Sequence, residues 1–207
     1  MTTGVEPIRD GPGVIYVPGR RQRDDEPDPV WDALWTLSGD AAACLPAAQS
    51  LYKRAFGEQV RAARLAVEHP GTTAAVGYSW GAWCLMAVMA EWGEVKKPLL
   101  LVNPPTGATH GANVLAGGLG FLPSRSRRIR SAFKLDSPDP AEIVHPERAR
   151  FVFCADDRAH HSEACRNKLG RTFTTAVAME GGHHLQSEEA GRLLDGELKR
   201  LLVDPDG

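Results

Sequence analysis

The stretch TTAAVGYSWGAW, residues 72–83, decides the fold. It begins with small and β-branched residues, which are typical of a buried strand, and it continues into the apolar segment AWCLMAVMAEW, which has the composition of a helix. Ser79 lies at the junction, between Gly77 and Gly81. The pattern Gly-x-Ser-x-Gly between a strand and a helix predicts a sharp turn that exposes the serine, so Ser79 is a candidate nucleophile.

The two glycines have a physical explanation. A nucleophile on a sharp strand-to-helix turn has a strained backbone, so its close neighbours must be small, and Gly77 and Gly81 supply that space. The turn also places Ser79 at the N-terminus of a helix, where the backbone N–H of Trp80 can point at a developing oxyanion. The alternative is an ordinary tight turn in a sheet, without chemistry at Ser79.

Further apolar runs flank this stretch and predict a mostly parallel sheet. They alternate with helix-like segments, as expected of strands that are covered on both faces. We predict strands over 13–18, 72–78, 97–103, 149–155 and 172–179. We predict helices over 57–69, 82–92 and 187–203.

Two segments depart from this alternation. Residues 19–40 begin as a charged loop with prolines and are predicted to end as a short Trp-rich helix. Residues 104–147 are rich in Gly, Pro and Arg, and a long irregular insertion in a compact domain is usually functional. We therefore predict a single domain over 1–207, in which 104–147 forms a cap.

The composition argues against several classes of function. The chain has 207 residues, 43% of them hydrophobic, and a formal net charge of -2, so no broad positive field favours nucleic acid or an anionic membrane. The N-terminus lacks the apolar segment of an export signal, and the apolar runs are too short to span a bilayer. The four cysteines lie far apart, which favours free thiols. We expect a soluble cytoplasmic protein that binds neither nucleic acid nor membrane.

A serine nucleophile needs a base, and the base needs an acid that orients it. Asp156 and Asp157 directly follow one predicted strand. His183 and His184 follow the next one. Because loops at the carboxyl ends of parallel strands gather on one edge of a sheet, we expect Ser79, an aspartate and a histidine to converge there.

The motifs GYSWG, FCADD and GGHH, in the chain order Ser, Asp, His, resemble those of the α/β-hydrolase superfamily. Within it, the short chain is similar to the small single-domain serine hydrolases of the dienelactone-hydrolase-like and esterase branch. The resemblance covers most of the chain and implies a three-layer fold, with a mostly parallel central sheet flanked by helices. It also implies a triad of Ser79, Asp157 and His183.

Two assignments depend on that resemblance. The family's usual spacing favours Asp157 over Asp156 and His183 over His184, whereas the residues themselves leave both pairs open. The family's second oxyanion donor is a backbone N–H in the loop after the first strand. Here that loop begins PGR, so the resemblance assigns the donor to the backbone N–H of Arg20.

One strand of the family has no clear counterpart in this sequence. It should lie between the first predicted strand and the helix that leads to the nucleophile, and the nearest candidate is VWDALWTLSG, residues 30–39. We therefore expect either a degenerate strand or a sheet that is trimmed on this side. The departure supports an alternative, a non-catalytic binding or scaffolding protein on the same fold.

These observations predict a serine hydrolase that cleaves a small-molecule ester or thioester through an acyl-enzyme, without a cofactor or metal. The oligomeric state is not indicated. A metal-assisted hydrolase is a further alternative, because the histidine pairs at 160–161 and 183–184 could act as ligands together with the aspartates. The arginine-rich run SRSRRIRS, residues 124–131, is interpreted as a solvated face, and otherwise as a grip for a phosphate-bearing substrate.

Overall fold

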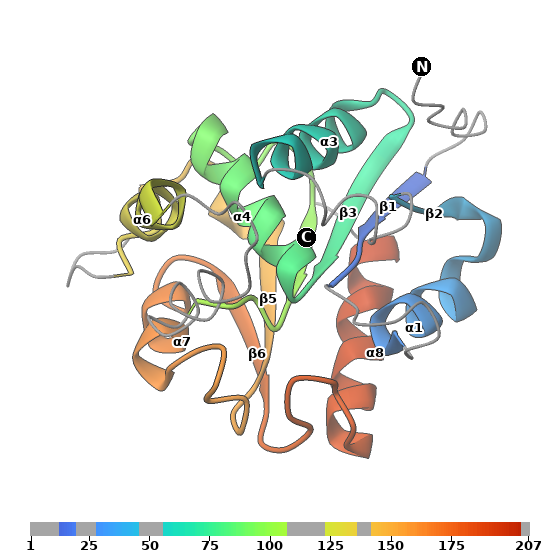
Figure 1. Ribbon diagram of the computed structural model, residues 1–207. Coiled ribbons are helices and arrows are strands. Elements are labelled where there is room, and N and C mark those ends of the chain that lie inside the picture. The colour runs from blue at the N-terminus through green and yellow to red at the C-terminus, as the bar shows by residue number, and fades with distance from the viewer. Residues whose placement is uncertain (1–12, 20–27, 46–55, 107–122, 136–141, 204–207) are drawn as a thin grey trace.

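A parallel sheet forms the centre of the molecule (Figure 1). The structure is a computed structural model that describes residues 13–19, 28–45, 56–106, 123–135 and 142–203. Within these residues the sheet has six strands in the order β2-β1-β3-β4-β5-β6. The strands are β1 (Gly13–Val17), β2 (Ala42–Cys44), β3 (Thr72–Tyr78), β4 (Leu99–Val102), β5 (Ala149–Cys154) and β6 (Thr174–Ala178). Every neighbouring pair is parallel.

Helices cover both faces of the sheet and complete the three layers (Figure 1). One face packs against α3 (Phe56–Glu68), α4 (Trp80–Trp92), α6 (Pro123–Ala132) and α7 (Glu163–Leu169). The other face packs against α1 (Pro29–Ser38) and α8 (Glu188–Val203). The α/β fold class with a parallel sheet between helices is therefore as the sequence predicted.

Alternation along each strand divides the core between the two faces. In β1, Ile15 and Val17 face the α4 side, whereas Val14 and Tyr16 face the α8 side. Successive side chains of a strand point to opposite faces, so a strand that is covered on both sides has to be apolar throughout. This explains why β1, β3, β4 and β5 could be recognised as continuous apolar runs, whereas the edge strand β6 is less buried.

The strand that had no clear counterpart is β2, and its position corrects one expectation. Residues 30–39 do not form a strand, because α1 begins after an N-cap at Asp28, whose side chain accepts a hydrogen bond from the N–H of Trp31. The Trp-rich helix predicted in this region is confirmed. The strand comes afterwards, at Ala42–Cys44, and pairs with β1.

The predicted insertion is partly described, through α6 and the turn that follows it. Ile129, Phe133 and Leu135 are buried in the core on the α4 side. Arg130 donates to the carbonyl oxygen of Thr106, which ties α6 to the segment that follows β4. Residues 107–122 and 136–141 lie outside the described residues, so the proposed cap stays a prediction.

The four cysteines are free, as predicted. Cys84, Cys154 and Cys165 are buried, and Cys44 is exposed on the edge strand β2. Among the described helices, none combines the length and the apolar character that crossing a membrane would require.

Candidate active site

Ser79 occupies the turn between β3 and α4. Its backbone has φ 49 and ψ -113, a conformation that costs energy in a residue other than glycine. Two main-chain hydrogen bonds hold it: Ser79 N–H donates to the carbonyl oxygen of Val102 at 2.8 Å, and Trp83 N–H donates to the carbonyl oxygen of Ser79 at 3.1 Å. The strained turn is therefore fixed between β4 and the first turn of α4.

The two glycines beside Ser79 are required by space. A Cβ atom on Gly81 would lie 1.9 Å from the carbonyl oxygen of Val17, and one on Gly77 would lie 2.8 Å from the Cα of Ala82. Both obstacles are backbone atoms, which cannot rotate away as a side chain can. Any larger residue would push α4 away from β1 or β3.

The structure brings Ser79, His183 and Asp157 together in one chain of contacts. The Nε2 atom of His183 lies 2.7 Å from Ser79 Oγ. The Nδ1 atom of His183 lies 2.6 Å from Asp157 Oδ2. These are hydrogen-bond distances, and they join residues from three separate strand ends.

The charge of Asp157 decides how the protons are arranged. Burial by itself raises the pKa of Asp157, but hydrogen bonds from His160 and His183 outweigh burial and hold this pKa well below its usual range. Asp157 is therefore an acceptor only, so the Nδ1 atom of His183 must carry a hydrogen. In the neutral ring Nε2 is then left to accept the hydrogen of the Ser79 hydroxyl.

The two neighbouring aspartates have different contacts. Asp157 is buried and faces His183, whereas Asp156 is exposed and turns to the backbone of the next loop. The carboxylate of Asp156 accepts the N–H of Gly182 at 2.9 Å and that of Gly181 at 3.2 Å. Asp156 therefore anchors the loop that carries His183.

The two neighbouring histidines also differ. His184 is exposed, and its Nδ1 atom lies 3.2 Å from the hydroxyl oxygen of Tyr78. The same hydroxyl donates to the carbonyl oxygen of His183 at 2.9 Å. His183 therefore directs its ring toward Ser79 while its backbone is held by the last residue of β3.

Asn103, which directly follows β4, is a further anchor that the sequence analysis missed. Its side-chain N–H groups donate to the carbonyl oxygens of Gly182 at 3.2 Å and His183 at 3.1 Å. Its Oδ1 atom accepts the N–H of the last residue of β5 at 2.9 Å. The signal that could have identified Asn103 is its position: a polar side chain at the carboxyl end of a buried strand, on the edge where the loops meet.

Of the two predicted oxyanion donors, one lies within the described residues. Trp80 is the first residue of α4, so its backbone N–H belongs to the positive end of that helix. Its side chain is part of the core, because the indole N–H donates to Gln59 Oε1 at 2.7 Å. Arg20 lies outside the described residues, but the preceding Gly19 is close to the candidate nucleophile: a Cβ atom there would be 3.2 Å from the Cβ of Ser79.

Two more histidines surround Asp157. His160 places its Nδ1 atom 2.8 Å from Asp157 Oδ1, and its ring stacks on that of His183 with centroids 3.8 Å apart. His161 is fully buried, and its Nε2 atom donates to the carbonyl oxygen of Cys154 at 2.9 Å. Burial lowers the pKa of His161 to about 4, so this ring is neutral near pH 7 and its Nδ1 atom bears no hydrogen.

Three of these side chains could also form a metal site. Asp157, His160 and His183 offer ligand atoms that all lie within 4.8 Å of one another. In the structure, however, the Nδ1 atom of each histidine is already hydrogen-bonded to Asp157. A metal ion bound through those nitrogens would have to replace both hydrogen bonds.

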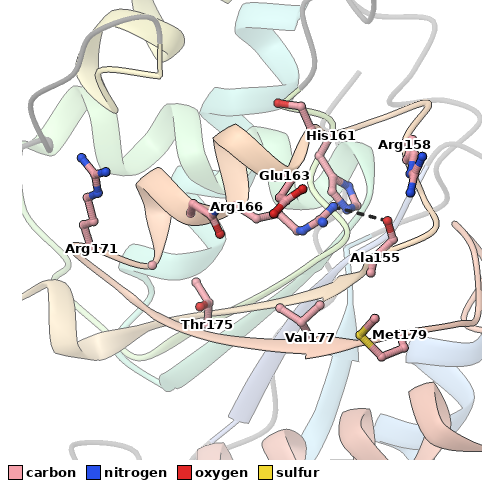
Figure 2. Close-up of a pocket in the computed structure, with 12 residues that line it drawn as sticks. Ala155, Arg158, His161, Glu163, Arg166, Arg171, Thr175, Val177 and Met179 are labelled. Carbon is pink, nitrogen blue, oxygen red and sulfur yellow. Dashed lines mark hydrogen bonds between the residues drawn. The ribbon is translucent and has the colours of Figure 1, made fainter.

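A separate hollow of about 980 Å³ lies between α7 and β6 (Figure 2). Arg158, Arg166 and Met179 are among its lining residues, and Arg166 donates to the carbonyl oxygen of Ala155 at 3.5 Å. His161 also lines the hollow, whereas Ser79 and His183 do not. The hollow therefore adjoins the loop that carries Asp157 without containing the candidate nucleophile.

The parallel sheet, the strained serine turn and the loops that meet beside it define the class of fold: the chain has the α/β-hydrolase fold. It is similar in structure to a YdeN-like hydrolase from Pectobacterium atrosepticum, with 18% identity, a TM-score of 0.58, and coverage of 96% of this chain and 93% of that one. It is also similar to Est1E from Butyrivibrio proteoclasticus, with 15% identity, a TM-score of 0.58, and coverage of 94% and 88%.

A third similar structure is an esterase/lipase from an uncultured bacterium, with 12% identity, a TM-score of 0.51, and coverage of 96% of this chain and 78% of that one. At these identities the likeness concerns the fold alone. The resemblance noted in the sequence is thus confirmed at the level of the fold. No protein-family model and no curated protein matches the sequence.

Proposed function

We propose that this protein is a serine hydrolase that cleaves a small-molecule ester or thioester. The observation that carries the proposal is the chain of contacts from Ser79 Oγ to His183 Nε2 at 2.7 Å and from His183 Nδ1 to Asp157 Oδ2 at 2.6 Å. A serine hydroxyl becomes a strong nucleophile when a positioned base takes its proton, and this arrangement supplies such a base.

The proposed reaction has two halves. Ser79 Oγ attacks the carbonyl carbon while His183 Nε2 takes the hydroxyl proton, and Asp157 stabilises the imidazolium that forms. His183 then gives the proton to the departing alcohol or thiol, which leaves an acyl-enzyme. Water attacks the acyl-enzyme with His183 as the base, and the proton returns to Ser79 as the acid is released.

The developing oxyanion requires donors close to Ser79. We assign one to the backbone N–H of Trp80, because it lies at the N-terminus of α4, where the helix dipole favours negative charge. The second is assigned to the backbone N–H of Arg20 from the family resemblance. Gly19 supports this assignment, since its closeness to Ser79 brings the loop after β1 up to the nucleophile.

The structural neighbours favour esters as the substrate class. Est1E has been crystallised with ferulic acid bound, and the neighbour from an uncultured bacterium is named an esterase/lipase. These descriptions belong to those proteins, and for the present chain they indicate which substrates to test first. A panel of p-nitrophenyl esters and acyl-CoA thioesters would identify the leaving group and the acyl length.

A fluorophosphonate probe tests the nucleophile directly, because it forms an adduct only with an activated serine. We expect the wild-type protein to be labelled and Ser79→Ala not to be, with a loss of hydrolysis of at least about a thousandfold. Ser131→Ala is the matched control, since Ser131 is an exposed serine on α6 and should label as wild type does. Labelling that persists in a folded Ser79→Ala variant would rule out this nucleophile.

Two other functions are distinguished by the same experiments. The cluster of Asp157, His160 and His183 is the observation that favours metal-assisted hydrolysis, which predicts inhibition by a chelator and activity that survives Ser79→Ala. A non-catalytic binding protein on this fold predicts neither adduct nor hydrolysis from a correctly folded wild-type protein.

A further inference from the structure

His160 is a conspicuous neighbour of the proposed triad that the proposed reaction does not use. It belongs to the loop between β5 and α7, and a third of its side chain is exposed, at 33%. It contacts both the acid and the base of the proposed triad, because it is hydrogen-bonded to Asp157 and stacked on His183. A role for His160 in catalysis rests on the proposed function, since it would consist in holding the acid and the base of that reaction.

The first contact fixes the orientation of the carboxylate. His160 Nδ1 lies 2.8 Å from Asp157 Oδ1, and His183 Nδ1 lies 2.6 Å from Asp157 Oδ2. Each carboxylate oxygen therefore has its own histidine, and an ionised carboxylate can only accept, so both Nδ1 atoms are donors. Rotation of the carboxylate about its bond to Cβ would break both hydrogen bonds at once.

The second contact restricts the base itself. The rings of His160 and His183 are 3.8 Å apart between centroids and inclined by 20°, which is van der Waals contact over the faces of the rings. The ring of Tyr78 also lies beside His183, but farther away, with centroids 5.7 Å apart. A base that must take and return a proton at Nε2 benefits from being held in one orientation.

His161 cannot replace His160 in this role. Its Nδ1 atom lies 3.8 Å from Asp157 Oδ2, bears no hydrogen in the neutral ring, and has no hydrogen-bond partner. Its Nε2 atom is committed to the carbonyl oxygen of Cys154. Among the side chains that the structure describes around Asp157, His160 is thus the one that donates to Oδ1.

We propose that His160 is a positioning residue of this site: it holds Asp157 through Oδ1 and supports the ring of His183 from one face. It acts through these two side chains and needs no contact with substrate. The proposal predicts that changes at His160 lower kcat and leave KM unchanged, because the affinity for the substrate does not depend on the orientation of the base.

Three substitutions separate the two contacts. His160→Ala removes both, and we expect kcat and the rate of fluorophosphonate labelling to fall by about tenfold to a hundredfold, the effect of losing a hydrogen bond to a charged group. His160→Asn keeps a side-chain N–H close to the position of Nδ1, and His160→Phe keeps a ring to stack. Each should recover part of the loss. His145→Ala, which removes an exposed histidine paired with Glu147, is the control and should change neither rate.

A second measurement reads the positioning without catalysis. In a Ser79→Ala background, long-range ¹H–¹⁵N spectra of the histidine rings should show His183 as the Nδ1–H tautomer. Adding His160→Ala should shift the His183 signals toward a mixture of tautomers or broaden them, whereas adding His145→Ala should not.

The outcomes separate this proposal from the proposed function. A wild-type kcat in His160→Ala, a change confined to KM, or unchanged His183 signals in the double variant would each overturn the positioning role. If the wild-type protein forms no adduct at Ser79, the proposed function fails. The spectra of His183 then still decide whether His160 holds the Asp157–His183 pair.

Discussion

The two halves of the candidate site are held in different ways. The elbow, residues 77–81, is fixed by backbone atoms, since Gly81 lies against the carbonyl oxygen of Val17 and Ser79 is hydrogen-bonded to the main chain of β4. The acid–base loops, residues 155–162 and 179–187, have main-chain hydrogen bonds within them, but side chains join the two loops to each other and to the sheet. Tyr78, Asn103, Asp156 and His160 are among these side chains.

This difference predicts how each half responds to substitution. At the elbow glycines, steric contact with backbone atoms leaves no room for even one more carbon atom, so every substitution should be unfavourable. Side-chain hydrogen bonds, by contrast, can be removed one by one, and the loss of each has a limited effect. The elbow should therefore be intolerant of added volume, and the acid–base loops should be sensitive to lost donors and acceptors.

The largest expected effect is that of Asp157→Asn. The amide can donate a hydrogen to His183 Nδ1, which stabilises the wrong tautomer and removes the base, so kcat should fall by about 10³–10⁴-fold. Asp156→Asn is the matched control. It keeps an acceptor oxygen for Gly182 N–H and should cost less than about tenfold. Equal losses in the two variants, measured as kcat on the same ester, would contradict the division of roles between the aspartates.

The elbow is tested by Gly81→Ala. The added Cβ atom would lie 1.9 Å from a backbone carbonyl oxygen, so the free energy of unfolding should fall by about 3 kcal/mol, at the upper end of typical overpacking effects. The control is Gly196→Ala in α8, where nothing lies within 4 Å of the added atom. That variant should gain up to about 1 kcal/mol from its higher helix propensity. Urea unfolding of both variants measures the contrast, and equal stabilities would argue against backbone contact as the restraint.

Lowering the pH should decrease the free energy of unfolding, because His161, in one of the acid–base loops, is buried as a neutral ring. Burial lowers the pKa of His161 to about 4, whereas the unfolded chain has a histidine pKa of about 6.5. Between these values the unfolded state binds a proton that the folded state does not, so the free energy of unfolding falls as the pH falls. Above about pH 6.5 His161 does not lower the free energy of unfolding. By pH 4 it lowers this free energy by up to about 3 kcal/mol.

His161→Gln tests this pH dependence, because the glutamine amide can still donate to the carbonyl oxygen of Cys154 but does not titrate. Urea unfolding at pH 7, 5.5 and 4.5 should give a flatter pH dependence for the variant than for the wild-type protein. Parallel curves would show that another group is responsible. The lowered pKa of Asp157 acts in the same direction but at lower pH.

The smallest effect is expected for Tyr78→Phe, which removes the hydrogen bond to the carbonyl oxygen of His183 and keeps the ring. We expect a loss of about 1 kcal/mol, seen as a several-fold decrease in kcat. Tyr16→Phe removes a hydrogen bond of 2.6 Å to Asp28, the N-cap of α1, and should lower stability without changing kcat. Loss of kcat in both variants would mean that the effect reflects general stability.

The difference between the two halves also explains what the sequence could reveal. Few residues besides glycine fit beside Ser79, so the elbow has a recognisable motif, and the long buried strands have continuous apolar runs. A hydrogen bond to the histidine loop can come from many residue types at many positions. The only sign of Asn103 in the sequence is its position after a buried strand, which does not say what the side chain binds, and His160 could be seen only as a possible metal ligand.

The strand β2 was missed for another reason. It has three residues, Ala42–Cys44, and so small a segment shows neither an apolar run nor alternation. Its place is set by pairing with β1, a tertiary contact that local sequence does not encode. The helix α7 was likewise not predicted, because its seven residues are too few for a clear helical period.

The short edge strand β2 has a practical consequence. It carries the one surface thiol among the four cysteines, since the other three are enclosed in the core. Cys44 is paired in register with Tyr16, near the carboxyl end of β1 and thus close to where the chain continues toward Arg20. A maleimide dye should therefore react with Cys44 alone in the native protein, without prior mutagenesis. Its fluorescence would report on the edge of the sheet where β2 pairs with β1.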